Sequence, residues 1–111
     1  MAHLISDADP TGCAVLARTS RLLAEVADAC GGAAPVELAT IHAAKGREWE
    51  RVIIYADDEG QMPHRTALGE EGGLEDERRL FYVALTRAKR RLEIVCTRGR
   101  ESRFLGEAWI G

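Results

Sequence analysis

Hydrophobic positions divide the chain into short apolar runs and amphipathic stretches, separated by polar segments. Near-continuous apolar runs, typical of buried strands, lie at residues 13–19, 36–41, 51–56 and 91–97. Helical spacing predicts helices over 21–30, capped by Ser20, over 74–88, and over a short closing segment, 102–109. Strands that alternate with helices predict an α/β fold with a parallel sheet flanked by helices.

The helix predicted over 74–88 has one apolar face. Its stripe consists of Leu80, Phe81, Ala84, Leu85 and Ala88. Residues 75–77 place three acids in the first turn, and Arg87 and Lys89 are predicted to complement the helix dipole in the last. Tyr82 lies on the opposite face, which predicts a surface or interface position.

Polar segments follow three of the predicted strands, at residues 18–20, 42–48 and 56–64. Ligands of open parallel sheets bind at the carboxyl ends of the strands, so functional residues are expected in these segments. The segment 42–50 is predicted to be a turn in which Gly46 meets a backbone requirement. The polar stretch 57–73 is long for a loop, which is typical of functional or mobile segments.

Composition indicates one globular domain. The chain has 111 residues, 46% hydrophobic and 30% charged, which predicts a flexible lead-in over 1–10 and a folded domain over 11–111. Three widely spaced cysteines and no cluster with histidine predict reduced, packed thiols and no metal site. No apolar run is long enough to span a membrane and no signal peptide is recognisable, so we expect a cytoplasmic protein without a membrane partner.

The formal net charge is −3, but the charges are segregated. Residues 57–77 carry eight acids against one base, and residues 78–103 carry nine bases against two acids. Two interpretations are open: solvated faces that neutralise each other, with Arg78 and Arg79 paired to the acids before them, or a surface that binds phosphate.

Two long segments carry a resemblance to a known family. They read TIHAAKGREWERVII (40–54) and EDERRLFYVALTRAKRRL (75–92), with DEGQMPH (58–64) between them. In order and spacing they resemble motifs V and VI of UvrD/Rep-type superfamily 1 DNA helicases, and AVLARTSRLLAEV (14–26) resembles the strand and helix that precede motif V. The resemblance implies the second RecA-like domain of a 3′–5′ motor, without the insertion that usually precedes motif V.

The resemblance implies an ATP site shared with an N-terminal RecA-like domain. Because no G-x-x-x-x-G-K-[ST] loop occurs here, that partner is expected to hold the phosphates and Mg²⁺, and the chain alone is not expected to hydrolyse ATP. Arg87 matches the arginine finger of the T-R-A sequence, and Glu48 matches the motif V glutamate that faces the nucleotide sugar, next to Gly46. Arg47 and Trp49 replace the leucine and phenylalanine that are commoner beside this glutamate.

The resemblance also implies contacts with single-stranded DNA. The candidates are Arg18, Ser20, Thr40, His42, Lys45 and His64. Thr40 and Lys45 would contact phosphates, which position a strand without reading its sequence. His64 is preferred over His42 because its loop is predicted to be polar and exposed. Ser20 is explained equally well as a helix cap.

Other hypotheses remain open on the residues alone. The chain fits a free-standing or degenerate module that binds nucleic acid or protein without ATPase activity, or a motor with another task, such as a helicase–nuclease subunit. In a purely structural interpretation, Arg87 complements a helix dipole, Glu48 is a solvated turn acid, and the histidines are surface or core residues.

Overall fold

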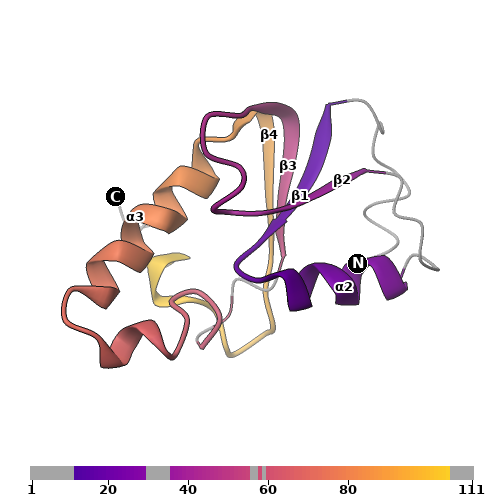
Figure 1. Cartoon of the computed structure of the whole chain (residues 1–111). Helices are drawn as coiled ribbons and strands as arrows, with labels where there is room; N and C mark the ends of the chain where they lie inside the picture. Colours follow the sequence, from indigo (N-terminus) through magenta and orange to yellow (C-terminus); the bar gives the residue numbers. More distant parts are fainter. Residues whose placement is uncertain (1–11, 30–35, 56–57, 59, 106–111) are drawn as a thin grey trace.

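The computed structural model describes residues 12–29, 36–55, 58 and 60–105. Its elements are β1 (Cys13–Ala17), α2 (Ser20–Ala29), β2 (Glu37–Thr40), β3 (Trp49–Tyr55), the 3₁₀ helix η1 (Ala67–Gly69), α3 (Gly73–Leu85) and β4 (Ala88–Val95). The strands form one sheet in the order β2-β1-β3-β4, and every neighbouring pair is parallel (Figure 1). The predicted α/β class with a parallel sheet is confirmed.

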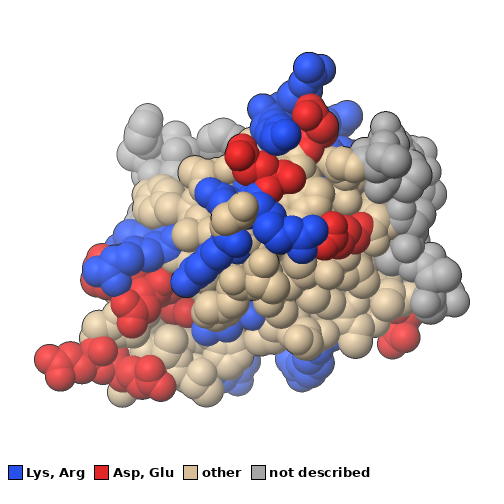
Figure 2. Space-filling view, turned by 45° about the horizontal axis from the view of Figure 1, so that its top comes forward, with Lys and Arg blue, Asp and Glu red and all other residues tan. Residues whose placement is uncertain are grey.

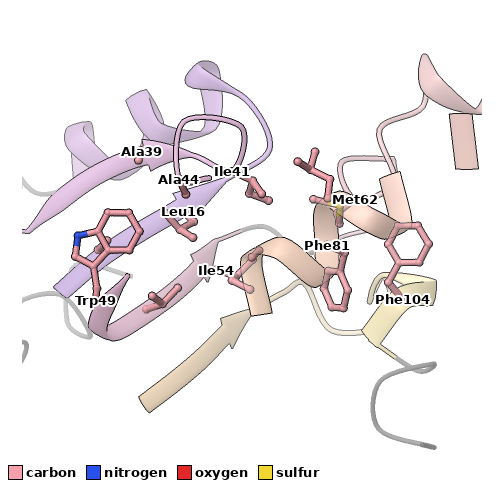
Figure 3. Close-up of a cluster of buried hydrophobic side chains, with 13 residues drawn as sticks. Leu16, Ala39, Ile41, Ala44, Trp49, Ile54, Met62, Phe81 and Phe104 are labelled. Atoms are coloured by element: carbon pink, nitrogen blue, oxygen red, sulfur yellow. The ribbon is translucent and has the colours of Figure 1, made fainter. Parts of the chain in front are cut away.

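Apolar side chains pack on both faces of the sheet. Alternate strand residues point to opposite faces, so Val15 and Ile53 join Val26 of α2, whereas Leu16 and Ile54 join the cluster under α3. Figure 3 shows that second cluster extending from Trp49 to Phe81 and Phe104. Ile53 and Ile54 are 0% and 1% exposed, which confirms the predicted burial of this strand on both faces.

Helix α3 crosses one face of the sheet from its carboxyl edge to its amino edge (Figure 1). Near its start, Glu77 forms an ion pair with Arg18, which follows the carboxyl end of β1. Just after its end, the Arg87 carbonyl accepts a hydrogen bond from the Trp49 amide at the start of β3, at 2.9 Å. The helix therefore connects the two edges of the sheet.

The start of α2 differs by one residue from its prediction. The strand before it ends at Ala17, so the chain turns earlier than expected and the helix itself begins at Ser20. The hydroxyl of Thr19, not that of Ser20, accepts the Leu22 amide, at 3.4 Å. The prediction of Ser20 as the cap was therefore wrong.

The end of α3 differs from its prediction by three residues. The helix stops at Leu85, and Ala88 and Lys89 belong to β4, so no base lies in its last turn. The interpretation of Lys89 as a complement of the helix dipole was therefore wrong. Arg87 lies just past the helix end, and its Nε donates to the Val83 carbonyl in the last turn, which agrees with that interpretation for Arg87. Helical spacing continues through Ala88, but pairing of Ala88 with Trp49 of β3 overrides it. The same pairing lengthens both strands toward their amino ends.

Some predictions fall on residues outside the described ones. They concern the lead-in 1–10, the end of the helix predicted over 21–30 with Cys30, and most of the closing helix. Of the closing helix, residues 102–105 are described and 103–105 are helical. Among the described residues, the Cys13 side chain is buried and the Cys96 side chain is half-buried. No helix in this part of the chain is long and apolar enough to cross a membrane.

Substitution of Gly73 tests the packing of α3 on η1. A Cβ on Gly73 would lie 1.8 Å from the Ala67 carbonyl oxygen, whereas a Cβ on Gly69 would meet nothing within 4 Å. We expect Gly73→Ala to lower the free energy of unfolding by about 1–3 kcal/mol, as overpacking does. Gly69→Ala, an open surface position, should change it by less than about 0.5 kcal/mol. Urea denaturation measures both, and equal midpoints would contradict this packing.

Candidate functional site

The candidate residues lie at two edges of the sheet, not at one. Arg18 and His42 follow the carboxyl ends of β1 and β2, as expected, but Glu48 and Arg87 directly precede β3 and β4 at the amino edge. Residues 41–48 account for the difference, because they carry the chain from the end of β2 back to the start of β3 without a crossover helix. The expectation that the segment 42–48 lies at the carboxyl edge was therefore wrong for Glu48, while Arg87, predicted in the last turn of a helix, lies between α3 and β4.

The carboxyl-edge cluster, formed by Arg18, His42, His64 and Glu77, is organised by a buried carboxylate. Glu77 is 4% exposed. Its two oxygens accept hydrogen bonds from Arg18 Nε and Nη2 at 3.0 Å each, and Oε1 also accepts the His64 amide at 2.7 Å. Such charge-assisted bonds satisfy a carboxylate that would be costly to bury alone.

The role of Glu77 was missed in the sequence, where it was assigned only to the first helical turn. Its position carries a signal that could have found it. Glu77 lies three residues before Leu80 and four before Phe81, so it shares the buried stripe of α3. An acid on an apolar helix face indicates a buried partner, which here is Arg18.

His64 is less exposed than expected, and less exposed than His42. His42 is exposed, whereas His64 is half-buried and its Nδ1 lies 2.7 Å from Thr66 Oγ1. The reason is that the His64 amide is bound by Glu77, which draws its loop onto α3. The expectation that His64 itself is exposed was therefore wrong, while its preference over His42 as a DNA contact stays a prediction.

The electrostatic surroundings of His42 favour its neutral form. Desolvation lowers the pKa of His42, the positive charges of Arg18 and Lys45 lower it further, and Glu77 opposes the shift. A hollow of about 320 Å³ separates His42 and Lys45 from α3, where Asp76 and Arg79 also line it. This hollow therefore carries charges of both signs.

Acids and bases of α3 pair with each other along its exposed side. Arg78 pairs with Glu75, and Arg79 Nη1 lies 2.7 Å from Asp76 Oδ1. The interpretation in which Arg78 and Arg79 pair with the acids before them is confirmed, and both pairs have i, i+3 spacing. Figure 2 likewise shows basic and acidic side chains interleaved on the face that it presents, with no single basic field.

The amino-edge cluster consists of Glu37, Arg47, Glu48, Trp49 and Arg87. The turn that leads to it starts with Thr40, whose Oγ1 accepts the Ala43 amide at 3.2 Å. It ends at Gly46, which has φ +79°. That left-handed conformation supports the predicted backbone role of Gly46. Glu48 is exposed, and no hydrogen bond or ion pair joins its side chain to another described residue.

The Arg87 guanidinium is held by neutral oxygens. Its Nε, Nη1 and Nη2 donate to the Val83 carbonyl, the Arg47 carbonyl and Thr86 Oγ1, each at 3.1 Å. No carboxylate in the part of the chain that the structure describes pairs with it. Arg47 and Arg90, at the same edge, pair instead with Glu37 and Glu50. The residues that bind Arg87 are thus uncharged at the accepting atoms and do not neutralise its charge.

Arg47 and Trp49 are bound on either side of Glu48. Arg47 Nη2 lies 2.5 Å from Glu37 Oε2, and Trp49 Nε1 donates to Glu37 Oε1 at 3.1 Å. These two hydrogen bonds, the one from Arg47 first, hold the pKa of Glu37 below its ordinary value. Arg47 and Trp49, which stand where leucine and phenylalanine are commoner, therefore both bind Glu37.

Removal of the Glu77 charge tests the carboxyl-edge cluster. We expect Glu77→Gln to lower the free energy of unfolding by about 3 kcal/mol, because it leaves Arg18 part-buried without its counter-charge. Glu75→Gln is the matched control, since Glu75 pairs with an arginine on the exposed side of the same helix. It should lower stability by less than about 1 kcal/mol. Similar urea midpoints for the two variants would disprove the central role of Glu77.

Known proteins with similar sequences are DNA helicases. The family described as UvrD-like helicase C-terminal domain matches residues 12–99. DNA helicase II of Escherichia coli (strain K12) is 42% identical over 82 residues, covering 65% of this chain and 11% of the relative. ATP-dependent DNA helicase PcrA of Bacillus subtilis (strain 168) is 40% identical over 87 residues, covering 69% and 12%. The chain spans about a tenth of the length of these relatives.

A solved structure shows the same fold. It is the C-terminal domain of a possible DNA helicase from Lactobacillus plantarum WCFS1, with a TM-score of 0.60 and 23% identity, and the match covers 86% of this chain and 61% of that one. The family match includes β1 and α3, both motif segments and both edge clusters. The chain therefore belongs to the UvrD-like helicase C-terminal domain family.

Proposed function

We propose that this chain is the second motor domain of an ATP-dependent 3′–5′ DNA helicase or translocase. In this proposal an N-terminal RecA-like domain binds ATP and Mg²⁺, and Arg87 completes the site from the facing domain. One observation carries the proposal. Among the described residues, the Arg87 guanidinium donates to neutral oxygens and to no carboxylate, and it lies beside the turn that holds Glu48.

The chemistry of phosphoryl transfer requires such a charge. Negative charge develops on the γ-phosphate oxygens, and a positioned guanidinium stabilises it. Three hydrogen bonds already orient Arg87, so little ordering remains when ATP arrives. Glu48 and Gly46 would lie near the sugar, where a carboxylate can accept from a ribose hydroxyl. Closure of the two domains on ATP and reopening after hydrolysis would then drive movement.

The carboxyl-edge cluster supports a track for single-stranded DNA. His42 is its exposed member, and the candidates Ser20 and Lys45 also face solvent, so these three residues are suited to direct contact. Arg18, Thr40 and His64 are engaged within the domain and would shape the track or exchange partners on binding. Contacts of this kind are sequence-tolerant and weaken as salt rises.

Helix α3 joins the two proposed sites. Its first turns carry Glu77 at the DNA edge, and Arg87 follows its end at the nucleotide edge. A rigid helix between two sites is a physical route by which DNA binding and ATP hydrolysis can affect each other.

The first test replaces Arg87 in a fusion of this chain to an N-terminal motor domain that carries a phosphate loop. We expect Arg87→Ala to lower kcat of the DNA-stimulated ATPase by about 10³-fold or more, as loss of an arginine finger does. Arg90→Ala is the control, because Arg90 is exposed at the same edge but pairs with Glu50. An Arg87→Ala rate within a few-fold of wild type, with folding intact by thermal melting, would disprove the assignment.

The second test compares the two lysines of the chain, Lys45 and Lys89, both exposed. In the same fusion, we expect Lys45→Ala to weaken binding to single-stranded DNA and to reduce the slope of log K against log salt by about 0.7, one phosphate contact. Lys89→Ala, on β4, should leave the slope unchanged. Fluorescence anisotropy with a labelled oligonucleotide measures both. If Lys89→Ala weakens DNA binding and Lys45→Ala does not, the DNA track lies along β4 and not at the carboxyl edge.

A further inference from the structure

Glu48 lies between two residues whose side chains share one carboxylate. Arg47 and Trp49 both bind Glu37, which begins β2 and lies ten residues before Arg47 and twelve before Trp49. The Arg47 guanidinium also lies over the Trp49 ring, 4.7 Å from its centroid. Trp49 is 6% exposed and packs in the core cluster (Figure 3), so it anchors this group to the sheet.

The backbones of the same two residues bind Arg87. The Arg47 carbonyl accepts from Arg87 Nη1 at 3.1 Å, and the Trp49 amide donates to the Arg87 carbonyl at 2.9 Å. Glu48 is therefore flanked by residues held at their side chains by Glu37 and at their backbones by Arg87. These contacts form a closed ring that fixes the Glu48 backbone relative to Arg87.

We propose that Glu37 is a positioning residue that, through Arg47 and Trp49, directs Glu48 and Arg87 toward the same nucleotide. This role rests on the proposed function of Glu48 and Arg87. The Glu48 side chain has no hydrogen bond or ion pair with another described residue, so its aim depends on the backbone on either side. Gly46 gives the preceding turn conformational freedom, which the ring removes at the next residue.

Glu37 also controls a competing charge. Arg47 directly precedes Glu48 and carries a guanidinium that, without Glu37, is free to pair with Glu48 or with a bound phosphate. With Glu37 present, Arg47 is neutralised and Glu48 is left to accept from a hydroxyl. Leucine at position 47 and phenylalanine at position 49 would need no carboxylate partner. The role of Glu37 is therefore specific to a sequence with arginine and tryptophan at these positions.

The test measures how well the fusion distinguishes ATP from 2′,3′-dideoxyATP, which lacks both ribose hydroxyls. We expect Glu48→Ala to reduce the ratio of the two kcat/KM values to near one. Glu37→Gln should reduce the ratio about threefold, since an exposed ion pair is lost while the hydrogen bond from Trp49 can persist. The change should appear in KM for ATP more than in kcat, because Arg87 retains its bonds to Val83 and Thr86.

Two controls separate positioning from general damage. Glu50→Gln removes another exposed acid next to Trp49, paired with Arg90, and should leave the ratio unchanged. In an Arg47→Leu background, Glu37→Gln should have a smaller effect than in the wild type, because the charge that it neutralises is gone.

The outcomes distinguish this inference from the proposed function beneath it. If Glu48→Ala leaves the nucleotide ratio at its wild-type value, both the ribose contact and the positioning role fail. If Glu48→Ala abolishes discrimination but Glu37→Gln does not change it, the positioning role of Glu37 is wrong and the proposed function stands. Equal losses from Glu37→Gln and Glu50→Gln would also overturn the positioning role.

Discussion

The ion pair between Arg18 and Glu77 joins the sheet to the helix on which both edge clusters depend. Glu77 is buried on α3, and its oxygens hold the residue that follows β1 and the backbone of the loop after β3. Since α3 packs on the core cluster at one face of the sheet, fixing its first turns also limits where its last turn ends. Arg87 follows that end, so its place at the amino edge depends partly on an interaction at the opposite edge.

The two edges differ in how they use charge. At the carboxyl edge, arginine and carboxylate neutralise each other in a part-buried pair. Desolvation, with the charges of Arg18 and Lys45, lowers the pKa of His42 and favours its neutral form. At the amino edge, Arg47 is neutralised by Glu37, while Arg87 donates only to neutral oxygens among the described residues. Neutral acceptors orient a guanidinium without cancelling its field, which suits a site for an anionic ligand.

Local patterns predicted the strands, the two long helices and the parallel sheet, because burial on both faces leaves a continuous apolar run, as at residues 52–54. The motif segments were equally visible in the sequence, and they carried the family. Local patterns failed where long-range pairing decides. The stripe of α3 continues to Ala88, yet Ala88 pairs with Trp49 in the sheet, so the helix ends before Arg87. Thr19 and Ser20 are both able to cap a helix. Thr19 caps α2 because β1 ends at Ala17 and the helix begins at Ser20.

The sequence by itself determined the alternation of strands and helices, the family, and the residue types at each candidate position, because periodicity and motif spacing are properties of neighbouring residues. Tertiary structure decided which of these residues meet. Glu37 and Trp49, or Arg18 and Glu77, are distant in sequence, and their contact follows from strand order and from the path of α3 across the sheet. Hydrogen bonds and ion pairs act over a few ångströms in space, so no local pattern could have assigned Glu37 or Glu77 its partners.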